Sequence, residues 1–76
     1  MDKLPDGQYD AVITSARLDT EGGLVLELAV RNGEFDGQLV PVRAAKQRFN
    51  LEPEELAERA VALTMRYGVA DVSLAE

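Results

Sequence analysis

The residues of this chain that could perform chemistry are carboxylates, because the sequence contains no histidine and no cysteine. Glu54, Glu55 and Glu58 lie close together in one segment, and Asp19 and Glu21 lie in another. Paired carboxylates act as general acid and base, or bind a hard cation, only when a pocket holds them at a defined separation away from water. In so short a chain we expect these side chains to be solvated, with no catalytic centre, no bound metal and no cofactor.

A second set of residues has the composition of a nucleic-acid site. Cations contact phosphates and aromatic rings stack on bases in such sites, and this segment offers both, in Arg43, Lys46, Arg48 and Phe49. If residues 44–49 form a helical turn, Lys46 and Phe49 lie on the same face of it. The alternative interpretation is that these cations form ion pairs with Glu52, Glu54 or Glu55.

The net charge of −6 is spread unevenly along the chain. Residues 1–36 carry eight acids and three bases, residues 37–49 carry three bases alone, and residues 50–76 carry six acids and two bases. Such a surface repels phosphate backbones but attracts a basic protein, although the charge would also serve solubility alone. The residues that we predict to contact a basic protein are Asp10, Asp19, Glu21, Glu27, Glu34 and Asp36, with Phe35 as an apolar anchor.

Three strands are predicted to position these side chains, over residues 8–18, 24–31 and 38–43. The middle strand gives the clearest signal, because apolar Leu24, Leu26, Leu28 and Val30 alternate onto one face. The alternation of the first strand changes phase near Thr14-Ser15, which predicts a β-bulge there. Pro41 cannot donate a hydrogen bond to a neighbouring strand, so the third strand is predicted either to lie at an edge of the sheet or to have a break in its pairing there.

The spacing of apolar residues over 53–67 predicts an amphipathic helix that covers the apolar face of this sheet. Pro53 suits the first turn of a helix, and Leu56, Ala60, Leu63 and Tyr67 recur at spacings of three or four. Residues 69–74 alternate again and predict a last short strand. The expected order is β-β-β-α-β, an α+β fold in which a small antiparallel sheet curls around one helix.

The first half of the chain contains a run of turn and strand residues that supports a resemblance. The run is Leu4-Pro5-x-Gly7-x-Tyr9-x-Ala11-x-Ile13, then a Leu/Val-rich strand, then Gly33-x-Phe35-x-Gly37. It resembles the opening of phage-encoded OB-fold proteins thought to bind single-stranded DNA. The resemblance implies a five-stranded barrel with a helix after the third strand, here truncated because four strands are expected. In size and acidity the chain also resembles small phage inhibitors such as anti-CRISPR proteins.

Length and hydropathy predict a single domain over residues 1–76 that does not contact a membrane. No apolar run approaches the roughly 20 residues that span a bilayer, and the N-terminus lacks the pattern of a signal peptide. We therefore expect a protein of the bacterial cytoplasm. An open edge of the predicted sheet could pair with a second copy to form a homodimer.

The sequence thus predicts a protein that is not an enzyme. Our interpretation is a small acidic protein of a phage or mobile element, which binds and inhibits a basic, nucleic-acid-handling protein. One alternative is a single-stranded nucleic-acid-binding protein that uses Arg43, Lys46, Arg48 and Phe49. The other is a structural subunit that assembles with further copies of itself.

Overall fold

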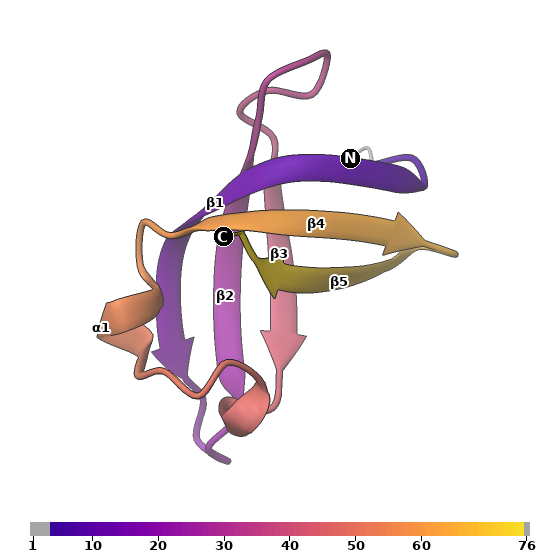
Figure 1. The fold of residues 1–76 in the computed structure, drawn as a ribbon. Helices are drawn as coiled ribbons and strands as arrows, with labels where there is room; N and C mark the ends of the chain where they lie inside the picture. Colours follow the sequence, from indigo (N-terminus) through magenta and orange to yellow (C-terminus); the bar gives the residue numbers. More distant parts are fainter. Residues whose placement is uncertain (1–3, 76) are drawn as a thin grey trace.

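The computed structural model describes residues 4–75, which form one antiparallel sheet with two short helical segments (Figure 1). The elements are β1 (Gly7–Leu18), β2 (Leu24–Arg31), β3 (Leu39–Ala44), the 3-10 helix η1 (Lys46–Arg48), α1 (Pro53–Leu56), β4 (Ala60–Arg66) and β5 (Val69–Leu74). The strand order is β3-β2-β1-β4-β5, so β1 pairs with both β2 and β4. The sheet curls into a half-barrel, and its two edge strands, β3 and β5, both line one hollow.

The long strand β1 changes partner along its length through a bulge. Residues 7–12 pair with β4, and the register with β2 shifts between Ile13 and Ser15. Thr14 is the additional residue, and its hydroxyl donates to the carbonyl oxygen of Glu27 at 3.0 Å. On the side of β1 that faces β4, the N–H of Ile13 donates to the carbonyl oxygen of Arg59. The carbonyl oxygen of Ile13 accepts from the N–H of Glu58, just before β4 begins. The predicted bulge is therefore confirmed, and it is the point at which the sheet turns.

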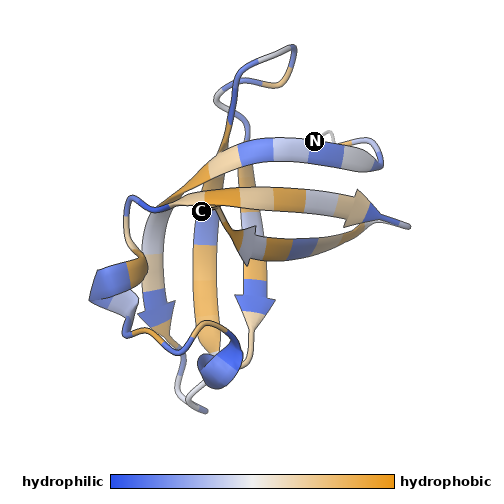
Figure 2. Cartoon of the chain, viewed as in Figure 1, coloured by the Kyte–Doolittle hydropathy of each residue, from blue (hydrophilic) through white to orange (hydrophobic). Residues whose placement is uncertain are grey.

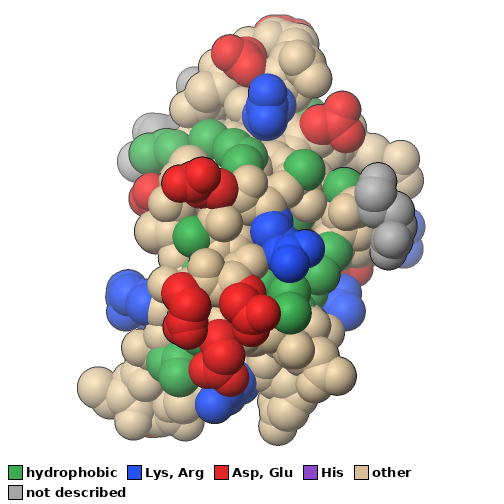
Figure 3. All heavy atoms as spheres, turned by 60° about the vertical axis from the view of Figure 1, so that its left-hand side comes forward, with side chains coloured by type: hydrophobic (Ala, Val, Ile, Leu, Met, Phe, Trp, Pro, Cys, Tyr) green, Lys and Arg blue, Asp and Glu red, His purple; other side chains and the backbone are tan. Residues whose placement is uncertain are grey.

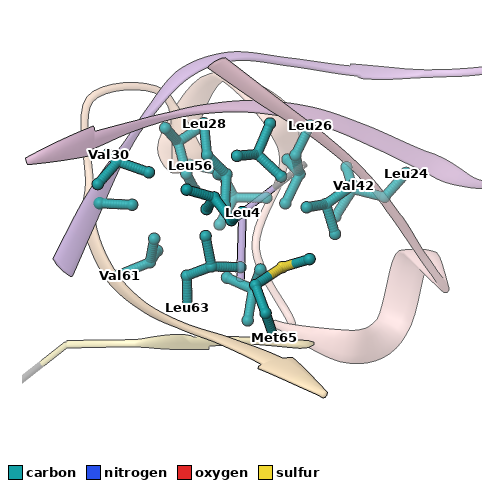
Figure 4. Packing of buried hydrophobic residues seen from close by; sticks show 14 residues of the cluster. Leu4, Leu24, Leu26, Leu28, Val30, Val42, Leu56, Val61, Leu63 and Met65 are labelled. Carbon is teal, nitrogen blue, oxygen red and sulfur yellow. The ribbon is translucent and has the colours of Figure 1, made fainter. Parts of the chain in front are cut away.

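The core lies inside the curl and is built from alternate residues of the strands (Figure 2). The four predicted residues of β2 are buried, with exposed fractions of at most 2%. The side chains packed with them come mainly from the other strands, as Figure 4 shows for Val42, Val61, Leu63 and Met65. Leu56 is the buried residue of α1. The prediction that a helix covers the sheet is wrong, because the sheet covers itself by curling.

The predicted helix over residues 53–67 is also wrong beyond Leu56. Its start is as expected, with Pro53 in the first turn and a capping box between Glu52 and Glu55. Backbone angles then leave the helical region, with ψ 136° at Ala57 and φ 69° at Glu58, and β4 begins at Ala60. Val61, Leu63 and Met65 point into the core, at strand spacing, while Tyr67 is 88% exposed.

This correction changes the fold class toward β. Residues 60–66 contain good helix formers, but pairing with β1 on one side and β5 on the other outweighs that local preference. Over residues 4–75 the observed order is β-β-β-α-β-β, with five strands rather than four and one short α-helix. The other predicted elements are confirmed: β3 with Pro41 is an edge strand, a helical turn follows it, and β5 ends the sheet.

Candidate functional site

The residues predicted to contact a basic protein do not form one patch. Asp19 and Glu21 lie in the β1–β2 turn, whereas Asp10, Glu34, Phe35 and Asp36 lie around the β2–β3 loop, which projects at the top of Figure 1. The eight residues of β2 separate these two groups by roughly 25 Å. Glu27 lies between them, exposed on the outer face of the sheet. Figure 3 shows a further gathering of acidic side chains on the side of the molecule where α1 lies.

The β2–β3 loop and β1 enclose a hollow of about 350 Å³, here called the loop hollow. Its lining residues are Gln8, Tyr9, Asp10, Arg31, Asn32, Gly33, Glu34 and Phe35. The rings of Tyr9 and Phe35 meet edge to face, with centroids 6.0 Å apart at 81°. The Tyr9 hydroxyl donates to the carbonyl oxygen of Pro5 at 2.7 Å, which fixes that ring. Both rings are half-buried against the core, so they form a rigid aromatic wall with exposed Asp10 and Glu34 beside it.

The loop that carries Phe35 is held by its own side chain and backbone. A carboxylate oxygen of Asp36 accepts a hydrogen bond from the backbone N–H of Asn32 at 2.7 Å. Asn32 and Gly33 both have positive φ, of 72° and 77°, which suits their residue types. Asp36 therefore shapes the loop, and its carboxylate is only partly free to contact a partner.

Asp19 has a similar structural role at the opposite end of β2. One of its carboxylate oxygens accepts the backbone N–H groups of Glu21 and Gly23 at 2.9 and 2.8 Å, and Arg43 lies 3.6 Å from the other oxygen. These backbone hydrogen bonds, that of Gly23 first, lower the pKa of Asp19 below its usual range, with a smaller contribution from Arg43. The carboxylate is thus committed to the turn, and Glu21 is the freely exposed acid there.

Three of the four residues of the predicted nucleic-acid site come together. Arg43, Arg48 and Phe49 line a hollow of about 250 Å³ between β3 and β5, here called the seam hollow, whereas Lys46 does not line it. The Arg48 guanidinium lies 5.5 Å from the centre of the Phe49 ring. It also donates to Asp71 at 3.2 Å and to the carbonyl oxygen of Val72 at 3.0 Å.

The ion pairs of these cations differ from the expected ones. Arg43 pairs with Asp19 and Arg48 with Asp71, rather than with Glu52, Glu54 or Glu55. The predicted partners are near in sequence, but the curl of the sheet brings Asp71 of β5 next to η1. Both cations keep exposed side chains, of 79% for Arg43 and 45% for Arg48, so both pairs are weak surface interactions.

A further exposed feature, the β4–β5 turn, was missed from the sequence. Tyr67 and Gly68 form a two-residue turn with φ of 54° and 76°. The Asp6 carboxylate accepts the backbone N–H groups of both residues, at 2.9 and 3.4 Å. A hollow of about 490 Å³ lies beside Tyr67. The available signal was the alternation of Val61, Leu63 and Met65 followed by Tyr-Gly, which indicates a hairpin rather than a helix.

Comparison with known proteins finds no relative of this chain, so the geometry alone supports the interpretation of its sites. A scan against protein-family models and searches of curated proteins and of solved structures find no match to this chain. Over residues 4–75, no acidic cluster is arranged to hold a metal ion. Within the same residues no helix is long and apolar enough to cross a membrane. The loop hollow and the seam hollow are the candidate binding sites because predicted contact residues line them.

Proposed function

We propose that this chain is a protein-binding module that docks on a basic partner through the loop hollow. The observation that supports the proposal is the assembly of Asp10, Glu34 and Phe35, three of the predicted contact residues, around that one hollow. The aromatic wall offers apolar contact area already fixed in place, so little side-chain freedom is lost on binding. Arg or Lys of the partner would pair with the exposed carboxylates at the rim.

The chemistry of the site favours a nucleic-acid-handling protein as the partner. Such proteins present basic surfaces to phosphate groups, and an acidic module bound there would inhibit by occupying that surface. This is the mode of action expected of a small inhibitor protein that a phage or mobile element encodes. The charge of −6 assists long-range attraction to such a partner, so association should slow as salt increases.

Changing the charge of the loop hollow tests this proposal. We expect Asp10→Asn combined with Glu34→Lys to weaken binding of a basic protein, captured from a bacterial extract by the immobilised chain, about tenfold or more. Asparagine is chosen at position 10 because Arg31 lies opposite in the register. Titration of the purified captured protein, followed by surface plasmon resonance, provides the affinities.

The matched control carries the same change in net charge at other positions. Glu58→Lys combined with Glu54→Gln alters exposed residues that lie outside the loop hollow and were not predicted as contacts. Equal binding by the two double variants would mean that net charge alone, rather than the loop hollow, determines the affinity. In that case the site assignment is wrong.

We infer single-stranded nucleic-acid binding at the seam hollow as a second candidate function. It is supported by the meeting of Arg43, Arg48 and Phe49, which offers cations next to an aromatic ring. The five curled strands with a short helix between β3 and β4 are also compatible with an OB-like barrel, the fold implied by the sequence resemblance. The surrounding negative charge opposes this function.

Fluorescence anisotropy of a labelled single-stranded oligonucleotide tests the second candidate. Binding at the seam hollow predicts saturation at micromolar concentrations, a loss of affinity with salt, and a further loss in Arg43→Ala/Lys46→Ala. Arg48 is retained because it bonds to the backbone of β5. The control Arg31→Ala/Arg66→Ala removes the same charge from two exposed arginines elsewhere. The absence of binding at low salt would exclude this function for the oligonucleotide.

A further inference from the structure

The tip of the β4–β5 hairpin, residues 66–69, presents side chains that the fold itself does not use. Tyr67 is 88% exposed and Val69 is 66% exposed, and these are two of the four large hydrophobic residues exposed among residues 4–75. Arg66 beside them is exposed and forms no ion pair with the described residues. Tyrosine and arginine are the residue types enriched at the centres of protein interfaces. The hairpin tip therefore has the composition of a contact surface.

The backbone of the hairpin tip is unfavourable for tyrosine but firmly held. Tyr67 has φ 54°, in the left-handed region that favours Gly, Asn and Asp, and asparagine is the usual residue at this position of a two-residue turn. Asp6 nevertheless fixes the turn by accepting both of its N–H groups. The backbone that carries the ring is thus held in place, although neither the turn nor the core requires an aromatic side chain there.

The loop hollow is complementary to the hairpin tip in shape and charge. It has a volume of about 350 Å³, enough for one aromatic side chain, and its wall is the Tyr9–Phe35 pair. Asp10 and Glu34 supply two negative charges to it, against one positive charge from Arg31. An aromatic ring accompanied by a cation, as in Tyr67 with Arg66, satisfies both features.

The two features also lie next to each other on the surface. The hollow beside Tyr67 and the loop hollow share Gln8 as a lining residue, so β1 separates them by little more than its own width. A two-fold axis near Gln8 would place the hairpin tip of each copy at the loop hollow of the other. Such an arrangement buries the same patch on both copies, as in most homodimers.

We propose that a second copy of this chain occupies the loop hollow, with Tyr67 inserted against the Tyr9–Phe35 pair and Arg66 paired with Glu34. The contact is reciprocal, so each dimer contains two such insertions. This proposal goes beyond the proposed function and does not rest on it. The two do share the loop hollow, so dimer formation competes with the binding of a basic partner.

Sedimentation equilibrium of the full chain over a range of concentrations tests the proposal. We expect the average mass to rise from that of one chain to that of two. Tyr67→Asn removes the ring but places a favourable residue in the turn, so it should remain folded and raise the dissociation constant about tenfold or more. Leu39→Asn, which alters an exposed hydrophobic residue of β3, should leave dimerisation unchanged.

An exchange of charges provides the second measurement. Arg66→Glu and Glu34→Arg should each weaken the dimer, because each places like charges in contact, and the double variant should restore it. Three outcomes overturn the proposal: a monomeric wild-type chain at all concentrations, a dimer unaffected by Tyr67→Asn, or a double variant no better than the single ones. Because no partner protein is present, none of these outcomes bears on the proposed function.

Discussion

Met65→Asp is expected to unfold the domain, whereas Tyr67→Asp is expected to leave it folded. Met65 is 6% exposed and packs in the core between the two sides of the curled sheet (Figure 4). A carboxylate at that position would be buried without a hydrogen-bond partner or counter-charge, at a cost of several kcal/mol. Domains of this length have a total stability of about 4–11 kcal/mol, so little or none would remain.

Tyr67→Asp is the control variant, because position 67 is exposed whereas position 65, two residues earlier, is buried. Tyr67 is almost fully exposed, and aspartate tolerates the positive φ of that position better than tyrosine does. Thermal unfolding followed by circular dichroism distinguishes the two variants. If residues 53–67 formed the amphipathic helix that their spacing suggests, position 67 would be buried and position 65 exposed. Unfolding of the Tyr67 variant and tolerance of the Met65 variant would therefore contradict the strand β4.

Deletion of Thr14 is expected to have a comparable effect through the bend of β1. Before the bulge, Ala11 and Ile13 point into the core with exposed fractions of 1% and 0%. After it, Ala16 is half-buried against the same core. Removing the additional residue leaves Ile13 opposite Leu28 and Ser15 opposite Glu27, so both halves of β1 keep their faces. It removes the bulge, however, and with it the bend by which β1 follows the curl of the sheet around the core. We expect the loss of cooperative unfolding and of dispersed amide resonances in NMR spectra.

Thr14→Ala is the matched control for this deletion. It keeps the number of residues in β1 and removes, with the exposed γ-methyl group, the hydroxyl that donates to the backbone and side chain of Glu27. The expected loss of stability is about 1 kcal/mol, the usual contribution of one hydrogen bond. A deletion variant with the same unfolding midpoint as the control would show that the bulge is not needed for the fold.

Part of the candidate site follows from residue types alone. The sequence predicted Asp10, Glu34 and Phe35 as contact residues, and β1 with the β2–β3 loop places all three beside one hollow. It also identified Asp19 and Asp36, but their carboxylates are engaged by the backbone of their own turns. Exposure and charge can be judged from the sequence, whereas hydrogen bonds that engage a carboxylate depend on turn geometry that it does not specify.

The pairing of cations with acids, and the role of Tyr67, depend on tertiary contacts. Arg48 meets Asp71 because η1 lies beside β5, and Asp6 holds the turn at Tyr67 from 61 residues away. No pattern over neighbouring residues encodes such distances. The assignment of residues 60–66 failed for the same reason, since their strand conformation is stabilised by β1 and β5 rather than by local preference.

The sequence by itself determined the elements whose signals are local. Strict alternation in β2, the change of phase in β1 and the missing N–H of Pro41 each restrict the backbone whatever surrounds them, and each was predicted correctly. Only the tertiary structure decided that Ala60–Arg66 is a strand, that the sheet closes over its own core, and which charged and aromatic side chains share a hollow. These features depend on burying apolar surface between segments distant in the chain, a term of the free energy that no short stretch of sequence contains.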